Sequence, residues 1–400
     1  RKLELKNLPT PTLPDSIGNL IRLEYLDLSF NKIERLPDTF GGCSEIKELR
    51  MNAMKIVDLP SSIGNLTSLE SLELNNSKIK QLPESFGKMS SLKKLNLYSS
   101  DLVSLPESFG NLKSLKFLNL NRSKLTSLPS SFGKLSRLKE LHIEANKLTS
   151  LPDSFGGLIS LKKAILKQNL LKSLPESFGK LESLEILNLY HNKITSLPES
   201  FGQLANLKEL VLSSNKLVEL PDSIAGLQTL EELRLDGNKL VTIPESFGEL
   251  SELKKAQLAM NKLKSLAQSI GMLENLEFLG LGGNNLTSLP DSIAYLRSLK
   301  ELRLNHNNFK SFPECLTKFE SYKELNLSNN LLEEVPNSIG NIEKIDNLDL
   351  SNNCFDHFPK NLLKINNIGL LDIRGNKFKM QREERKKIKN VSVHLYYDHI

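Results

Sequence analysis

Residues 23–33 read Leu23-Glu-Tyr-Leu-Asp-Leu-Ser-Phe-Asn-Lys-Ile33, and this pattern returns every 23 residues along the chain. The alternation of apolar and outward-facing residues around Leu26 and Leu28 predicts a short strand. Asn31 follows the strand, and the in-phase positions up to Asn376 are Asn in twelve of sixteen cases; the exceptions are Met54, Ser77, Ser100 and Ser123. An uninterrupted period of this length predicts a solenoid in which each coil packs only against its neighbours.

The strands of successive coils run in the same direction, so the sheet must be parallel and in register. Neighbouring strands then lie about 4.8 Å apart. The sixteen positions in phase with Leu28 are all Leu, Ile or Met. Those in phase with Leu26 depart from Leu only at Ala164 and Ala256, which remain apolar. These two columns are therefore the predicted core of the sheet.

The return segment of each coil begins with proline. Pro recurs in phase from Pro14 to Pro359, interrupted only by Ala267. Proline has no amide hydrogen, so this segment is expected to be turn or extended backbone outside the ladder. Ser-Phe-Gly or Ser-Ile-Gly follows, as at Phe86-Gly87. The Phe or Ile fills the coil interior, Gly permits a turn that a side chain would obstruct, and one turn of 3₁₀ or α-helix is expected.

The repeated Asn is predicted to be structural. A buried carboxamide bonds both backbone amides and backbone carbonyls that no strand partner reaches, and stacked coils repeat this as a ladder. The Ser residues in phase with it supply fewer hydrogen bonds, and Met54 supplies none of comparable strength. We therefore expect the coils from about residue 46 to 125 to form the less stable section of the solenoid.

The ends of the chain depart from the repeat. Residues 1–378 are expected to form a solenoid of about 17 coils, the first of them partial, and residues 379–400 a C-terminal cap. Within the cap, residues 380–389 are typical of an amphipathic helix and residues 391–397 of a terminal strand that blocks the sheet edge. Because the chain begins at Arg1 in mid-repeat, we expect that upstream sequence, with any export signal, has been removed.

The charge balance disfavours nucleic-acid binding. The chain has 53 Lys and Arg against 47 Asp and Glu, a formal +6 over 400 residues, which is modest beside nucleic-acid-binding domains. A stripe of Lys after the ladder position and an acidic stripe six residues further on cancel beyond about 8 Å at physiological salt. The two stripes lie at 32, 55, 78, 124, 147, 193, 216, 239, 262 and 377, and at 38, 84, 107, 153, 176, 199, 222, 245, 291 and 314.

The cysteines and the hydropathy exclude two further classes. The three cysteines form no CxxC pair, and we expect reduced thiols, with Cys43 at an apolar position and Cys354 at an exposed one. No stretch approaches the roughly 18 apolar residues of a membrane span. The chain is therefore neither a disulfide scaffold nor a predicted transmembrane protein.

The sequence resembles the leucine-rich-repeat family through its LxxLxLxxNxL segment followed by LPxSFGxLxxL, which covers essentially residues 2–378. The LPESFG and LPDSIG return segments are most similar to bacterial, particularly leptospiral, members, and they also resemble the Ras-binding group. The resemblance implies an α/β solenoid, a horseshoe with a parallel β-sheet on the concave face and short 3₁₀ or helical turns and loops on the convex face. It implies protein partners bound on the concave face and no common enzymatic activity.

No constellation of catalytic or metal-binding residues emerges. His142, His191 and His306 are expected on outward strand positions, at least two coils and roughly 10 Å apart. Asp349 beside Asp372, and Glu209 beside Glu232, could hold a hard cation, but two carboxylates without further oxygen ligands make only a weak site. Gly280, Gly282 and Gly283 open no helix, so they predict a bare patch beside Phe278 rather than a phosphate loop. We expect no enzyme, no metal site and no cofactor.

Departures from the consensus on the outward strand face are the best functional clues. Large apolar residues gather on this face in the coils between residues 98 and 211, and polar residues surround them. This composition is typical of protein-binding hot spots. The alternative is that aromatic and β-branched residues simply favour strands. The candidate partner-binding residues are Tyr98, Phe117, Asn119, Arg122, His142, Glu144, Ile165, Lys167, Ile186, Asn188, Tyr190, His191 and Val211.

The leading functional hypothesis is a non-enzymatic recognition module, a bacterial surface or secreted protein that engages a host or envelope protein on its concave face. A second hypothesis is an intracellular, cytoplasmic signalling scaffold like the Ras-binding group. A third is the recognition part of an effector enzyme whose catalytic domain lies outside this chain. A monomer is expected. The reading frame on both sides of residues 1–400 would separate the three hypotheses.

Overall fold

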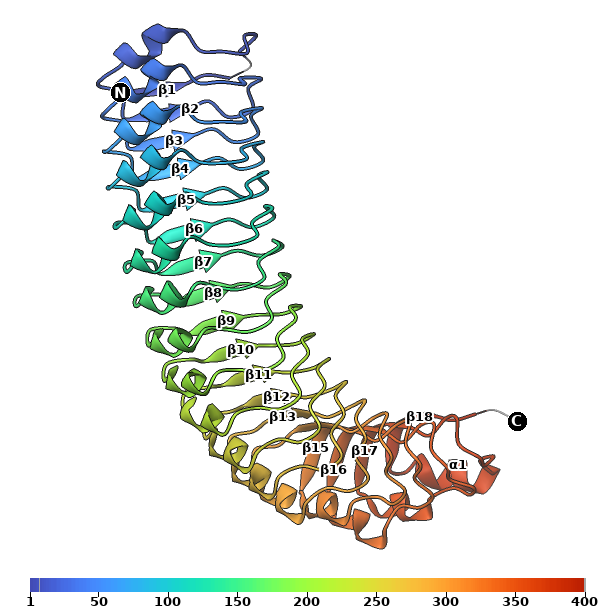
Figure 1. Ribbon diagram of the computed structural model, residues 1–400. Coiled ribbons are helices and arrows are strands. Elements are labelled where there is room, and N and C mark those ends of the chain that lie inside the picture. The colour runs from blue at the N-terminus through green and yellow to red at the C-terminus, as the bar shows by residue number, and fades with distance from the viewer. Residues whose placement is uncertain (7, 399–400) are drawn as a thin grey trace. The chain divides into compact units, whose positions relative to one another are not determined.

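Parallel strands joined by short turns follow one another along the chain (Figure 1). The computed structural model describes residues 1–6 and 8–398 and divides the chain into two units, Arg1–Leu207 and Lys208–Ile400. We refer to them as the N-terminal unit and the C-terminal unit. Each is built from the predicted coils.

Each coil of the described chain contributes one strand. In the N-terminal unit these are β1 Lys2–Glu4, β2 Tyr25–Asp27, β3 Glu48–Arg50, β4 Ser71–Glu73, β5 Lys94–Asn96, β6 Phe117–Asn119, β7 Glu140–His142, β8 Lys163–Ile165 and β9 Ile186–Asn188. In the C-terminal unit they are β10 Glu209–Val211, β11 Glu232–Arg234, β12 Lys255–Gln257, β13 Phe278–Gly280, β14 Glu301–Arg303, β15 Ser321–Asn326, β16 Lys344–Asp349, β17 Asn367–Asp372 and β18 Ser392–Tyr396.

Within each unit consecutive strands pair in parallel. Up to β17 the residues opposite each other are 23 positions apart, as Leu95 opposite Leu118 and Leu302 opposite Leu325, whereas β18 pairs with β17 at an offset of 24. The predicted open, parallel, in-register sheet is therefore confirmed in both units. The middle residue of each three-residue strand from β2 to β14 is buried and carries the core, and Leu95, Leu118, Leu302 and Leu325 are all fully buried. Three residues per strand are enough to form a stable sheet, because each new coil adds another strand to the same backbone hydrogen-bond network.

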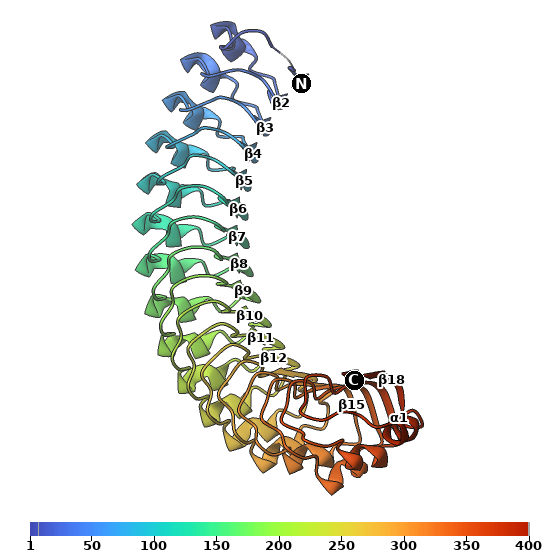
Figure 2. The ribbon, with the colours of Figure 1, turned by 90° about the vertical axis from the view of Figure 1, so that its right-hand side faces the viewer.

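The return segments form 3₁₀ turns, on the opposite side of the coil from the strands (Figure 2). Proline precedes most of them in extended backbone, as Pro129 does at φ −66°. In the N-terminal unit the turns are η1 Asp15–Asn19, η2 Asp38–Gly42, η3 Ser61–Asn65, η4 Glu84–Lys88, η5 Glu107–Asn111, η6 Ser130–Lys134, η7 Asp153–Gly157, η8 Glu176–Lys180 and η9 Glu199–Gln203. In the C-terminal unit they are η10 Asp222–Gly226, η11 Glu245–Glu249, η12 Gln268–Met272, η13 Asp291–Tyr295, η14 Glu314–Lys318, η15 Asn337–Asn341 and η16 Lys360–Lys364.

The turns bury a stack of phenylalanine rings in the N-terminal unit. Phe86 to Phe201 lie in successive coils with neighbouring ring centroids 5.6–6.2 Å apart and nearly parallel planes. The glycine after Phe is required by close approach in the coils from Phe86 to Phe178: a Cβ on Gly133 would lie 1.7 Å from the carbonyl oxygen of Ser154 in the next coil. The predicted obstruction is thus between coils rather than within one turn.

The asparagine ladder forms as predicted. Asn169 donates from Nδ2 to the carbonyls of Ile143 (2.7 Å) and Leu166 (3.1 Å), and its Oδ1 accepts the amide of Leu148 at 3.1 Å. The same pattern recurs at Asn261 in the C-terminal unit. Each Asn therefore ties its own turn to the preceding coil.

The lapses of the ladder leave backbone groups without partners. In an intact coil, the ladder Asn accepts a backbone amide of the preceding coil. Where Met54, Ser77, Ser100 and Ser123 replace Asn, the corresponding amides are those of Ile33, Ile56, Ile79 and Leu102, in that order. None of the four amides makes a hydrogen bond among the described residues. Ser100 and Ser123 bond each other through their hydroxyls at 2.9 Å, and the buried Ser77 hydroxyl has no partner in the described part of the chain. An unpaired buried amide costs about 1–3 kcal/mol, so the prediction of a softer section gains a physical basis.

The C-terminal segment contains a helix and a strand close to the predicted bounds. Helix α1 spans Arg382–Ile388, with a capping box between Gln381 and Glu384, and buries Ile388. Strand β18 pairs in parallel with β17. That this segment acts as a cap remains a prediction.

Candidate functional site

Each short strand turns its two flanking residues outward. In β6, Leu118 is buried while Phe117 and Asn119 are half-buried on the outer side. We call the outer side of β5–β9 and the residues just after each strand the N-terminal strand face, and that of β11–β14 the C-terminal strand face. The columns continue in register, so Asn119, His142 and Ile165 lie side by side.

The first group of candidate residues forms aromatic contacts. The rings of Phe117 and His142 lie 5.5 Å apart and tilted by 42°. The Arg122 guanidinium lies 5.6 Å from the centroid of the Tyr98 ring, within cation–π range. Tyr98 and Phe117 are half-buried. The structure therefore joins these four predicted residues in two contacting pairs along β5–β7, which we together call the aromatic cluster.

His142 is held in its neutral form. Burial lowers the pKa of this imidazole below the ordinary 6.5, and the nearby Lys163 lowers it further. Glu140, whose carboxylate lies 3.5 Å from Nε2, opposes the shift without reversing it. At neutral pH the ring therefore presents an uncharged, partly apolar surface beside Phe117.

A second group lies on β8 and β9. Ile165 pairs in register with Asn188, and both Ile165 and Ile186 are half-buried. Tyr190 follows β9, is 39% exposed, and has its ring 5.8 Å from that of His191. Lys167 and Glu144 form an ion pair of 3.3 Å. These two charged candidates therefore neutralise each other.

The expected exposure of Val211 is wrong. It was expected on the exposed face, but it lies in the other unit, on β10, and its exposed fraction is only 7%. Val211 pairs in register with Arg234, and a short side chain on a parallel ladder is shielded by longer neighbours. The candidate site is therefore confined to the N-terminal unit.

The asparagines of the strand face are partly committed to the backbone. Asn119 Oδ1 accepts the amide of Asn121 at 3.0 Å, and Asn188 Oδ1 accepts that of Tyr190 at 3.0 Å. These bonds fix the chain as it leaves each strand. Sequence alone suggested free polar groups at both positions. In these two side chains Oδ1 is occupied, whereas Nδ2 makes no hydrogen bond to the described residues and stays available to a partner.

The residue before each ladder position adopts a left-handed backbone. His191 and His306 have φ near 55° and lie after the strand rather than on it, which corrects their expected placement. Asn and Gly suit this conformation, whereas larger residues are strained. Phe30 and Met260 occupy it while 73% and 67% exposed. The sequence signal was present, since Gly237, Gly283 and Gly375 stand at this position.

The acidic stripe predicted from the sequence has a structural role. Glu107 accepts the amides of Ser130 (3.0 Å) and Ser131 (3.2 Å) at the start of the next 3₁₀ turn, which lowers its pKa. Glu245 does the same for Gln268 and Ser269. These carboxylates therefore connect coils in addition to balancing the Lys stripe.

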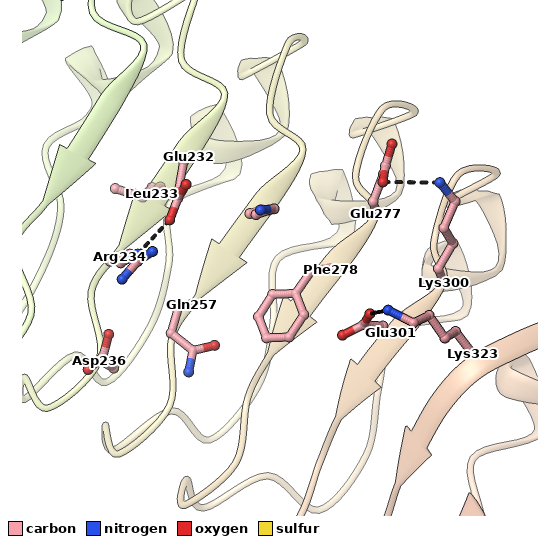
Figure 3. Close-up of a pocket in the computed structure, with 11 residues that line it drawn as sticks. Glu232, Leu233, Arg234, Asp236, Gln257, Glu277, Phe278, Lys300, Glu301 and Lys323 are labelled. Atoms are coloured by element: carbon pink, nitrogen blue, oxygen red, sulfur yellow. Dashed lines mark hydrogen bonds and ion pairs between the residues drawn. The ribbon is translucent and has the colours of Figure 1, made fainter. Parts of the chain in front are cut away.

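The C-terminal strand face contains a hollow of about 650 Å³ beside Phe278 (Figure 3). Its charges are largely paired: Glu232 with Arg234, Glu277 with Lys300 and Glu301 with Lys323. The expected bare glycine patch is absent from this part of the described chain, because the space above the glycines is filled. A Cβ on Gly280 would lie 1.8 Å from Oε1 of Gln257, and one on Gly283 would lie 2.7 Å from Sδ of Met260.

The carboxylate pairs are occupied by neighbouring side chains. Asp349 and Asp372 lie in register, but Arg374 binds Asp372 at 3.0 Å and Ser351 donates to Asp349 at 2.6 Å. Within residues 1–6 and 8–398, His, Cys, Asp and Glu form no group of three or more suited to a metal ion.

The thiols and the helices offer no further site among the described residues. Cys43, Cys315 and Cys354 are free; Cys354 is half-buried rather than exposed, and burial raises the pKa of Cys315 to about 11. No described helix has both the length and the apolar character to cross a bilayer.

Comparison with known structures supports the predicted resemblance. A leucine-rich-repeat protein of Leptospira interrogans is 33% identical, with 99% of this chain and 100% of that chain covered and a TM-score of 0.79. The leucine-rich-repeat ectodomain of an Arabidopsis thaliana receptor kinase, solved with Casparian strip integrity factor 2, is 30% identical over 99% of this chain and 52% of that chain, with a TM-score of 0.65. An internalin of Listeria monocytogenes shares the fold at 22% identity, 78% and 88% coverage and a TM-score of 0.65.

Family models agree with the structures. The leucine-rich repeat region model matches residues 1–98, 75–168 and 164–268, and leucine-rich repeat models match 251–309, 274–332 and 323–342. A search of curated proteins gave no match. Because the family models cover most of the repeats and the similarity to the Leptospira protein runs along the whole length, the chain belongs to the leucine-rich-repeat family.

Proposed function

We propose that this chain is a non-enzymatic recognition module that binds a protein partner on the N-terminal strand face. Leucine-rich-repeat chains typically serve as protein-binding modules. The observation that carries the proposal is the set of half-buried and exposed aromatic and apolar groups on the outer side of β5–β9, from Tyr98 to Tyr190. Aromatic anchors surrounded by polar groups are the composition of interaction hot spots.

The arrangement favours binding over catalysis. The His142 ring contacts that of Phe117 at a tilt, and Lys167 is paired with Glu144. A reaction would need an acid, a base and a nucleophile converging in a pocket, whereas these groups are engaged with one another. Binding requires only complementary shape and chemistry, which a row of strand side chains provides.

The double variant Phe117→Ala, Tyr190→Ala tests the proposal. A partner captured with the wild-type chain and then purified should bind the variant at least about 2 kcal/mol more weakly in a calorimetric titration, because two anchors are lost. The melting temperature should stay unchanged, since both side chains lie outside the core. Phe278→Ala in the C-terminal unit is the matched control. Equal affinity of wild type and double variant, or a loss in the control instead, would reject this site.

We further propose that the protein is exposed on, or secreted from, a bacterial cell. Support comes from the similarity along the whole chain to a protein of Leptospira interrogans and from the shared fold of the internalin. The encoded sequence preceding Arg1 tests this point. An export signal in the reading frame would agree with the proposal, whereas a reading frame without one would favour the intracellular scaffold.

A further inference from the structure

A strongly cationic edge borders the N-terminal strand face. It consists of the segments that lead from the 3₁₀ turn into the strand in four successive coils, residues 88–94, 111–117, 134–140 and 157–163. These segments contain ten Lys or Arg and a single carboxylate, Glu140. We call them the lysine edge. All of it lies within the N-terminal unit.

The charges of the lysine edge are compensated only at its margins. Lys93 pairs with Glu70 at 2.8 Å, and Lys162 pairs with Glu185 at 2.7 Å. Between them, the exposed Lys116, Arg137 and Lys139 make no ion pair with any described residue. The centre of the edge therefore carries free positive charge.

The scaffold does not require this charge. The equivalent segments of the C-terminal unit, 226–232, 249–255, 272–278 and 295–301, contain four cations and seven carboxylates in the same fold. Like charges on strands about 4.8 Å apart repel one another. The clustered cations oppose folding in the N-terminal unit, and the C-terminal unit folds without such a cluster. They therefore point to an external anion as their binding partner.

The lysine edge also adjoins the apolar part of the site. Lys116 directly precedes Phe117, and Lys163 occupies the same strand as Ile165. Protein interfaces commonly combine an apolar centre with a charged rim. A partner that covers Phe117 and Ile165 would place its own margin over the unpaired cations.

We propose that the partner presents an acidic, amphipathic helix, with its apolar stripe on the aromatic cluster and a row of carboxylates on the lysine edge. This rests on the proposed function and names the chemistry of the partner. Nine of the ten cations are Lys, whereas phosphate recognition favours the planar fork of Arg. Residues three or four apart on a helix lie about 5–6 Å from one another, close to the coil repeat of about 4.8 Å.

The test uses a synthetic amphipathic helical peptide in which Leu and Phe form one stripe and Glu recurs at i and i+4 beside it. Its binding to the full chain is followed by fluorescence anisotropy, alongside the same peptide with Gln for Glu. The Glu peptide should bind at least about tenfold more tightly, and 0.3 M salt, as a rough working value, should reduce the difference.

Two matched double variants locate the contact. Lys116→Gln, Lys139→Gln should weaken binding of the Glu peptide about tenfold, whereas Lys254→Gln, Lys300→Gln removes the same net charge from the C-terminal unit and should change binding less than about twofold. Equal losses in the two variants, or equal binding of the Glu and Gln peptides, would overturn the proposal. So would absence of binding, or tighter lysine-dependent binding of a single-stranded oligonucleotide or of phosphatidylglycerol vesicles.

Failure of this inference can be told from failure of the proposed function. If Phe117→Ala, Tyr190→Ala weakens binding of the captured partner but the lysine variant does not, the site stands and the acidic helix is rejected. If neither double variant affects the captured partner, the site itself is rejected, and the acidic helix with it.

Discussion

The N-terminal and C-terminal strand faces use the same columns of the same repeat but carry opposite chemistry. Beside the N-terminal face, unpaired lysines adjoin half-buried aromatic residues. On the C-terminal face, carboxylates and cations neutralise each other around the hollow beside Phe278. Because both fold with the same backbone, the difference cannot be a requirement of the coil. It is the contrast on which the proposed partner site rests.

The interiors of the two units differ as well. Asn fills the ladder positions of the described C-terminal unit, whereas the N-terminal unit replaces it at Met54 and at three serines. In return, the N-terminal unit stacks Phe rings from Phe86 to Phe201. Since a solenoid is stabilised by the sum of contacts between neighbouring coils, local stability should follow these differences.

The largest change in stability is expected when an Asn of the intact ladder in the C-terminal unit is replaced by Met, the residue found at position 54. Asn261→Met removes the acceptor of the Leu240 amide and the donors to the Leu235 and Leu258 carbonyls. The buried groups left unpaired should reduce the free energy of unfolding by about 3 kcal/mol. Denaturant unfolding measures this change, with Lys262→Met at the adjacent exposed position as control. Equal stability of the two variants would show that the ladder contributes little.

A smaller effect of opposite sign should follow from repairing a lapse. Ser77→Asn supplies an acceptor for the unpaired Ile56 amide and should stabilise the N-terminal coils by about 1 kcal/mol. Hydrogen exchange should show faster exchange in coils 46–125 than in coils 146–376 of the wild type, and slower exchange around residue 56 in the variant. Ser71→Asn, on the strand face, is the control. Uniform protection of all coils in the wild type would contradict the proposed soft section.

The smallest effect concerns pH. His142 has a lowered pKa in the folded state, so the unfolded chain takes up the proton first as pH falls. The stability linked to neutral His142 is complete above about pH 6.5 and is lost as pH falls through the lower folded-state pKa. Between pH 7.5 and 5, roughly, the melting temperature of wild type should therefore fall more than that of His142→Asn. His306→Asn is the control, and parallel curves for all three proteins would contradict the shift.

Most of the fold could be predicted from the sequence, but only part of the site. Strand positions, register, the Asn ladder and the 3₁₀ turns follow from the 23-residue period, because each coil contacts only its neighbours. The aromatic members of the site followed from departures from the consensus. The burial of Val211 and the backbone bonds of Asn119 and Asn188 did not, because they depend on side-chain torsions and on residues one coil away.

The sequence by itself determined that this protein is a solenoid with one sheet column, one ladder and one turn column per coil, since a strict period admits one stacking. Only the tertiary structure decided which groups are already satisfied. It pairs Lys167 with Glu144 and Lys93 with Glu70, yet leaves Lys116 and Lys139 without an ion pair among the described residues. Coulomb interactions depend on distance across coils, which a linear sequence does not contain. That distance separates a neutral surface from an edge with unpaired cations.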